Sequence, residues 1–156
     1  MIIIDTDIAS AFAKAGHFDM LIKLFGVVGI TPRVYEELLT PLEHGHEYPK
    51  EIFEKTELVT VSDDEQREYL KLRGEHAEIG KGETESIVVC LRREHSFSSF
   101  DKRAISTAKE LGVNIITAGV IFKGLIVKNI ATKEEVLKII KDIETADNRL
   151  LSRVEL

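Results

Sequence analysis

Four acidic side chains are best placed to do chemistry: Asp5, Glu37, Glu83 and Asp101. Asp5 and Asp101 each follow a predicted strand, Glu83 begins a helix directly after a glycine turn, and Glu37 lies on a helix whose inner face is expected to face the sheet. Ligands of open α/β sheets bind just beyond the carboxyl ends of the strands, so we expect these acids to converge there. Like charges at short range raise one another's pKa, which makes such a cluster costly unless a cation fills it. Carboxylate oxygens suit Mg²⁺ and Mn²⁺, and a metal held there can activate water and stabilise charge on a phosphate during hydrolysis.

Each of these acids also has a purely structural explanation. The macrodipole of a helix stabilises negative side chains in its first turn. Asp is also a preferred N-cap residue, so Asp5 taken alone fits a helix cap as well as a ligand. Only the convergence of several acids at one edge of a sheet favours the metal site.

The elements that must position these acids alternate along the chain, which predicts a three-layer α/β/α fold with a mainly parallel sheet. Ile2-Ile3-Ile4 has no helical period and is typical of a strand buried on both faces. Further strands are predicted over 27–30, 57–61, 97–100 and 113–117. Helices are predicted over 7–25 (broken at Gly16-His17), from Pro32, over 62–73, 83–91, 102–111 and 119–127, and from Thr132.

The helix that opens at Thr31-Pro32, with an N-cap threonine and a proline in its first turn, carries two adjacent glutamates. Glu37 lies beside the apolar face of this helix and Glu36 lies further round. We expect Glu37 to belong to the site, with Glu36 as the alternative if the register differs by one. Residues 41–49, which begin and end with proline and contain Gly45, are predicted to form a loop.

The bulk composition restricts the class of protein. A chain of 156 residues with 44% hydrophobic and 31% charged residues is expected to form a single domain, 1–156. No apolar stretch approaches the ~20 residues of a membrane span. Met1 leads directly into a strand, so we expect no signal peptide and a cytoplasmic protein. The single cysteine, Cys90, excludes an intramolecular disulfide and a multi-cysteine zinc site.

The net charge of −6 is unusual for a protein that binds nucleic acid, because such proteins usually carry a basic face. Either the chain avoids nucleic acid, or it holds carboxylates that metal ions neutralise. Basic residues near the predicted cluster are candidate phosphate contacts. They are Arg33, Lys50, Lys81, Lys102, Arg103 and Lys109.

The order and spacing of the motifs resemble those of the PIN-domain ribonucleases, the family of the VapC toxins. The resemblance extends over roughly residues 2–145. The matching segments are IIDTD (3–7), TPRVYEEL (31–38), GKGETESI (80–87), SSFDKR (98–103), AKELGV (108–113) and GVIFKGLI (119–126).

This resemblance implies a metal-dependent endoribonuclease that hydrolyses RNA with Mg²⁺ or Mn²⁺. The implied catalytic residues are Asp5, Glu37, Glu83 and Asp101, of which Asp5, Glu83 and Asp101 would bind metal. It also implies a homodimer, and a role as the toxin of a toxin–antitoxin pair with a protein antitoxin as partner.

The chain departs from the family pattern at two positions, which leaves one or two metal ions open. Asp7 replaces a small hydroxylic residue or asparagine, and Phe100 stands where the subfamily with Gly-x-Gly-Glu commonly has another aspartate. Ser99 matches a hydroxylic position that is expected to orient Asp101.

Two other functions fit parts of the pattern. A strand followed by Asp5-Thr6-Asp7 matches a haloacid-dehalogenase-type phosphatase, with Asp5 as nucleophile and Asp7 as general acid. That mechanism requires two acids after a later strand, where Phe100-Asp101 supplies one. The third possibility is a non-catalytic PIN domain that binds RNA or protein.

Overall fold

The computed structural model describes residues 1–151 and Leu156, with strands and helices alternating as predicted. The elements along the chain are β1 (Ile2–Ile4), α1 (Thr6–Lys14), α2 (Phe18–Phe25), β2 (Val28–Ile30), α3 (Pro32–Glu43), α4 (Tyr48–Lys55), β3 (Glu57–Leu58), α5 (Asp63–Glu75), α6 (Lys81–Arg93), β4 (Ser96–Ser98), α7 (Lys102–Glu110), β5 (Asn114–Ile115), α8 (Ala118–Val127) and α9 (Lys133–Ala146).

A five-stranded parallel sheet, in the order β3-β2-β1-β4-β5, forms the centre of the described chain. β1 occupies the middle because Ile2, Ile3 and Ile4 are all buried, with exposed fractions of 3%, 0% and 0%. It pairs with β2 on one side and with β4 on the other, where Ile4 lies opposite Ser98. The prediction of a strand buried on both faces is confirmed.

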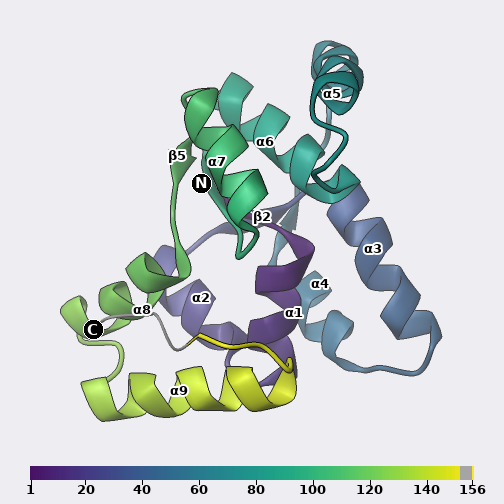
Figure 1. The fold of residues 1–156 in the computed structure, drawn as a ribbon. Coiled ribbons are helices and arrows are strands. Elements are labelled where there is room, and N and C mark those ends of the chain that lie inside the picture. Colours follow the sequence, from purple (N-terminus) through teal and green to yellow (C-terminus); the bar gives the residue numbers. More distant parts are fainter. Residues whose placement is uncertain (152–155) are drawn as a thin grey trace.

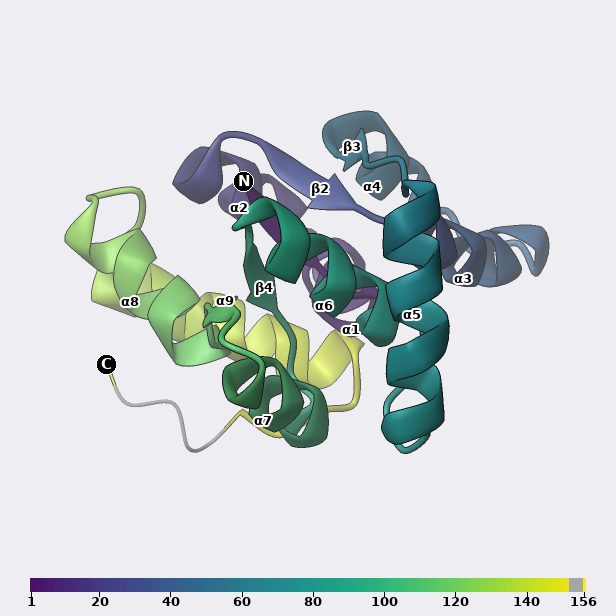
Figure 2. The same cartoon turned by 90° about the horizontal axis from the view of Figure 1, so that it is seen from above.

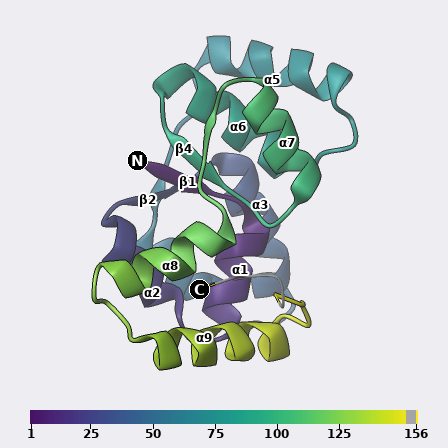
Figure 3. The ribbon, with the colours of Figure 1, turned by 60° about the vertical axis from the view of Figure 1, so that its left-hand side comes forward.

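Helices cover both faces of this sheet, so the molecule has three layers (Figures 1 and 2). One face packs on α5, α6 and α7 through Ile3 and Phe97. The other packs on α1, α2, α8 and α9 through Ile2 and Ile4. Figure 3 shows α5, α6 and α7 together on one side of the strands, with α2, α8 and α9 on the other. The predicted α/β/α architecture with a parallel sheet is confirmed.

The four strands other than β1 are shorter than predicted, because each extends only as far as its hydrogen bonds to a neighbouring strand and β1 is short. β2 spans Val28–Ile30, where a strand over 27–30 was predicted. β4 ends at Ser98, opposite the last residue of β1, so Ser99 and Phe100 form a connection that leads into Asp101. β5 spans Asn114–Ile115 and β3 spans Glu57–Leu58, where longer strands over 113–117 and 57–61 were predicted.

The predicted loop over residues 41–49 is confirmed only for residues 44–47, and its two ends are wrong. α3 continues through Pro41 to Glu43, and α4 begins at Tyr48. Pro41 lies in the last turn of α3, so the backbone hydrogen bond that it cannot donate is lost only at the end of the helix. Pro49 lies in the first turn of α4, where the backbone N–H has no partner within the helix. Ile52, fully buried, anchors α4 to the core and outweighs the loop-like composition before it.

The predicted starts of two helices and the predicted break at Gly16 are confirmed. Capping boxes start α5 at Ser62 and α9 at Thr132, and Gly16 (φ +78°) separates α1 from α2. Cys90 is a buried core residue, and burial raises the pKa of its thiol to about 12. Every helix in residues 1–151 is too short or too polar to cross a bilayer.

Candidate metal centre

Asp5 lies at the carboxyl end of the central strand and is held on both sides. Its Oδ1 atom accepts a hydrogen bond from the backbone N–H of Ile8 at 2.9 Å, so Asp5 is the N-cap of α1. Its Oδ2 atom accepts a hydrogen bond from the hydroxyl of Ser99. Only 1% of Asp5 is exposed. The roles of helix cap and metal ligand are therefore compatible for Asp5, because the carboxylate that caps α1 also faces the edge of the sheet.

Asp7 and Glu83 complete a cluster with Asp5. One carboxylate oxygen from each of the three residues lies within 4.8 Å of the other two. Asp7 belongs to the first turn of α1, and Glu83 to the first turn of α6. Below, these three residues are called the acid cluster.

Glu83 contributes an oxygen with no interaction inside the protein. Its Oε2 atom is buried and has no hydrogen-bond partner among the described residues. A buried, unpaired polar atom is rare in a folded protein because it loses its hydration without compensation. A cation between three carboxylates would supply the missing interaction, and an all-oxygen donor set suits Mg²⁺ or Mn²⁺. The residues present therefore fit a divalent metal.

Asp101 lies next to the acid cluster but outside it. Its carboxylate caps α7 by accepting a hydrogen bond from the N–H of Arg103 at 2.8 Å. The structure thus gathers Asp5 and Glu83 as predicted, but it places Asp7 in the position expected for Asp101. Ser99 does more than was expected of it, because its hydroxyl donates to Asp5 and accepts from the backbone N–H of Asp101 at 2.9 Å.

Glu37, rather than Glu36, faces the start of α6. Its two oxygens accept hydrogen bonds from the backbone N–H of Gly82 at 2.9 Å and from the hydroxyl of Thr6 at 2.7 Å. A Cβ atom at Gly82 would collide with the Glu37 carboxylate and would stand 3.1 Å from Val34 Cγ2. Glycine at this position therefore allows α3 to approach α6, and Glu37 joins the helices that carry Asp7 and Glu83.

A buried ion pair reinforces the same junction. The carboxylate of Glu85 accepts a hydrogen bond from the backbone N–H of Arg33 at 2.9 Å and lies 3.1 Å from its Nε. Thr31, predicted to cap α3, makes no side-chain cap hydrogen bond, and Glu85 takes over that function from α6. The Arg33 guanidinium also covers the ring of Tyr69 at 4.2 Å. Arg33, a candidate phosphate contact in the sequence, is thus engaged inside the protein.

Of the other candidate phosphate contacts, Lys50 pairs with Glu47 at 2.6 Å on α4. Lys102 and Arg103 stand at the start of α7, directly after Asp101. They line an open hollow of about 370 Å³ together with His76 and the acids Glu78 and Glu110. These two basic residues thus follow a site residue directly in the chain, whereas Arg33 is engaged inside the protein.

The acids of the site disfavour one another's charge. Burial raises the pKa of Glu83 to about 8, with the negative charges of Asp5, Asp101, Asp7 and Glu37 adding to the effect. Burial also raises the pKa of Asp5 to about 7, although hydrogen bonds from Ile8 and Ser99 oppose the rise. Without a cation, these two carboxyl groups hold protons near neutral pH. A divalent ion that binds between them would displace these protons.

A family model described as a PIN domain matches residues 1–154 of this chain. The chain belongs to the PIN-domain family. No curated protein shows a significant match to it. The resemblance seen in the sequence motifs is therefore confirmed for the PIN domain as a whole. PIN domains are in general metal-dependent nucleases, and in this one Asp5, Asp7 and Glu83 form a site that could bind a divalent metal.

Two features of this PIN-domain site were not predicted from the sequence. Thr6, between the two aspartates, anchors Glu37, although the sequence marks it only as a turn-forming residue. Arg149, in the unassigned tail after α9, lies over the ring of Phe100 with its Cζ atom 4.4 Å from the ring centre. Neither contact has a local signal in the sequence, because both join segments far apart along the chain.

Proposed function

We propose that this PIN domain is a metal-dependent endoribonuclease that hydrolyses phosphodiester bonds of RNA. The observation that supports it best is the buried, unpaired Oε2 atom of Glu83 within reach of the Asp5 and Asp7 carboxylates. Three converging acids repel one another, and the caps and helix N-termini they serve leave the buried Oε2 atom of Glu83 without a partner among the described residues. Their cost is accounted for if a cation binds among them.

Asp5, Asp7 and Glu83 would hold Mg²⁺ or Mn²⁺, and Asp101 would add negative charge at the rim. A cation bound there activates water and stabilises the negative charge that develops on a phosphate. Ser99 and the N–H of Ile8 fix the orientation of Asp5. Glu37 fixes the start of α6, on which Glu83 stands, through the N–H of Gly82.

RNA as the substrate is supported by the VapC-like motifs and by Lys102 and Arg103, which directly follow Asp101. A homodimer and a protein antitoxin belong to the same proposal through that resemblance, and a cytoplasmic location is proposed from the sequence. The dehalogenase-type mechanism has less support, because the chain belongs to another family and Phe100-Asp101 supplies one acid where two are required.

The test is incubation of the purified protein with single-stranded and structured RNA, in Mn²⁺, in Mg²⁺ and in EDTA. A DNA oligonucleotide of the same sequence is the substrate control. We expect internal cleavage of RNA with metal and none in EDTA. Undiminished cleavage in EDTA would overturn the proposal, and binding of RNA without cleavage would identify the non-catalytic alternative.

A further inference from the structure

Arg149 brings a positive charge to the loop that carries part of the site. Its guanidinium covers the ring of Phe100, with the Cζ atom 4.4 Å from the ring centre. Phe100 separates Ser99, which donates a hydrogen bond to Asp5, from Asp101. Through Phe100, Arg149 therefore contacts the connection between Ser99, which binds Asp5, and Asp101.

The chain around Arg149 is fixed by contacts on both sides. Asp147 forms an ion pair with Lys14 of α1 at 3.0 Å and accepts a hydrogen bond from the Nε of Arg149 at 3.1 Å. Asn148 has φ +49°, a left-handed conformation that turns the chain back from the end of α9. Leu151, only 9% exposed, packs into the core that also contains the apolar face of α1. The fold therefore holds Arg149 beside Phe100.

This arrangement leaves one edge of the guanidinium available. Nε is used by Asp147, whereas the two terminal nitrogens have no hydrogen-bond partner among the described residues. A guanidinium with two free parallel N–H groups binds a phosphate in bidentate fashion, and stacking on an aromatic ring pre-orients it. A polyanion that approaches several carboxylates meets repulsion, which a cationic contact at their border would offset.

We propose that Arg149 binds a phosphate group of the nucleic-acid substrate at the border of the acid cluster, with Phe100 as the surface that orients it. This inference rests on the proposed nuclease function. It assigns substrate binding to the segment after α9, which the metal site itself does not use.

The test compares wild type, Arg149→Gln, Arg149→Lys and Arg67→Gln in RNA cleavage with saturating Mn²⁺. Arg67 is an exposed arginine on α5 and serves as the matched control for loss of one positive charge. We expect Arg149→Gln to raise KM about tenfold or more, the effect of losing a charged hydrogen bond. Arg149→Lys, which keeps the charge without the planar fork, should recover part of the loss, and Arg67→Gln should behave as wild type.

Further measurements separate phosphate binding from a structural role. Arg149→Gln should not weaken Mn²⁺ binding, because it removes a positive charge, and it should stay folded at the assay temperature although it loses its bond to Asp147. In an Asp5→Asn background, the slope of log affinity for single-stranded RNA against log salt should become shallower by about 0.7 when Arg149 is replaced. Phe100→Leu should raise KM by a smaller factor, because it removes the stacking surface and leaves the arginine.

The outcomes distinguish this inference from the proposed function. If wild type cleaves RNA and Arg149→Gln cleaves it equally well, only the inference is overturned. A loss of activity that follows weaker Mn²⁺ binding or unfolding at the assay temperature would also overturn it, because Arg149 would then support the fold or the metal site. If wild type fails to cleave RNA with any metal, the proposed function is wrong and the phosphate site falls with it.

Discussion

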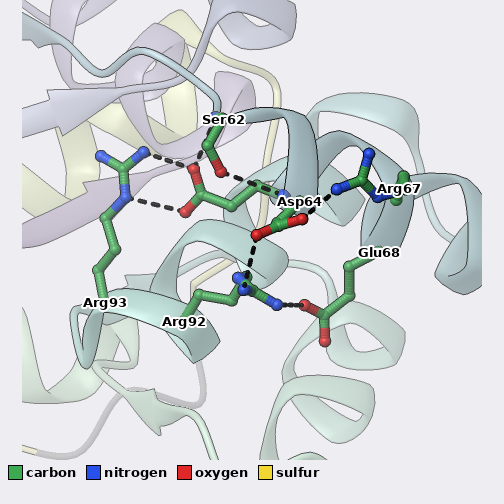
Figure 4. A network of polar contacts seen from close by, with 7 residues as sticks. Ser62, Asp64, Arg67, Glu68, Arg92 and Arg93 are labelled. Carbon is green, nitrogen blue, oxygen red and sulfur yellow. Dashed lines mark hydrogen bonds and ion pairs between the residues drawn. The ribbon is translucent and has the colours of Figure 1, made fainter.

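Two groups of carboxylates in this molecule show opposite electrostatics. Between α5 and α6 the acids are paired: Glu65 bonds to Arg93 at 2.8 Å, and Glu68 bonds to Arg92 at 2.9 Å, as Figure 4 shows. At the carboxyl end of β1, Asp5 and Glu83 face other acids. Acidic residues are thus common to both regions, and the partner decides which group stabilises the fold and which is available for a ligand.

The pKa values express this difference. Burial alone would raise the pKa of Glu65, but the hydrogen bonds and charge of Arg93 lower it below its ordinary value. Burial and neighbouring acids raise the pKa of Glu83 to about 8. An acid cluster kept without counter-charges reduces stability and is retained for function. This difference can be tested by replacing one acid in each region and comparing the activity and the stability of the two variants.

The largest expected effect is on catalysis. Asp5→Asn should reduce metal-dependent RNA cleavage by about 100-fold or more, since even supporting residues of metal sites are worth 10–100-fold. Glu65→Gln removes an acid that is just as buried and should leave the cleavage rate of the folded protein unchanged. Both rates are measured under single-turnover conditions at a temperature where both variants are folded. Equal activities would erase the functional distinction between the two regions.

The next effect concerns the two adjacent glutamates of α3. Glu37→Ala removes the acceptor for Gly82 and Thr6 and should lower the cleavage rate by about 10- to 100-fold. Glu36→Ala, one position away and exposed, should retain the wild-type rate. The reverse ranking would show that the junction between α3 and α6 does not position the acid cluster.

Thermal stability should respond to metal in one region only. In EDTA, Asp5→Asn relieves repulsion and keeps the helix cap, because Asn caps about as well as Asp, so it should melt higher than wild type. A relief of about 1 kcal/mol corresponds to roughly 2–4 °C for a chain of this size. Mn²⁺ at ~100 times its Kd adds about 2.7 kcal/mol to the stability of wild type and should reverse that order.

Glu65→Gln is the control for this measurement. Loss of the charged hydrogen bonds to Arg93 should cost about 2 kcal/mol, or roughly 4–8 °C, with and without Mn²⁺. Identical melting curves for wild type and Asp5→Asn in both conditions would exclude a shared metal site at Asp5.

The pH dependence of stability should separate the regions as well. A raised pKa in the folded state means that the folded protein binds more protons than the unfolded chain. The stabilisation that Asp5 and Glu83 provide through these protons is therefore complete below about pH 4 and is lost as the pH rises through about 7 to 8. Metal-free wild type should therefore lose at least about 1 kcal/mol of unfolding free energy between pH 5.5 and 8.5. Asp5→Asn should show a smaller loss. Urea titrations in EDTA at both pH values measure the difference.

Glu65 should behave in the opposite way. Because the pKa of Glu65 is depressed in the folded state, its carboxylate stabilises the fold above about pH 4.5. This stabilisation is lost as the pH falls through the folded-state pKa. Glu65→Gln should therefore lower stability equally at pH 5.5 and 8.5 and leave the slope of wild type unchanged. A slope that follows Glu65 instead of Asp5 would contradict the assignment of the strained carboxylates.

The smallest effects come from two helical glycines. Gly82→Ala pushes a methyl group into Glu37 and should lower both the melting temperature and the cleavage rate. Gly74→Ala in α5 meets nothing within 4 Å and should stabilise the protein by about 0.5–1 kcal/mol. If the two substitutions have the same sign in a melting experiment, close packing at Gly82 does not constrain the site.

The sequence predicts those parts of the site that depend on local position. Asp5 could be located because it follows the apolar run Ile2-Ile3-Ile4, and ligands of open α/β sheets bind beyond the carboxyl ends of the strands. Glu37 could be chosen over Glu36 because helical spacing relates it to the buried face. The parallel sheet itself follows from the alternation of strand and helix signals along the chain.

The parts that failed depend on tertiary contacts or on competing local signals. Asp7 stands two residues after Asp5, but only the approach of α6 to α1 shows that it joins Glu83. Arg149 and its contact with Phe100 require knowledge of where α9 ends in space. α4 was missed because Pro41, Gly45 and Pro49 favour a loop, whereas burial of Ile52 favours a helix.

The central position of β1 has a consequence for how the protein is made. Its neighbour β2 follows early in the chain, but its other neighbour β4 begins only at Ser96. At the usual speed of translation, 5–20 residues per second, the isoleucine strand waits roughly 5–20 s for that second partner. During this interval one edge of an entirely apolar strand has no partner, which is the condition under which chains aggregate or bind chaperones. The same strand that places Asp5 at the edge of the sheet therefore makes the nascent chain depend on timely synthesis of its second half.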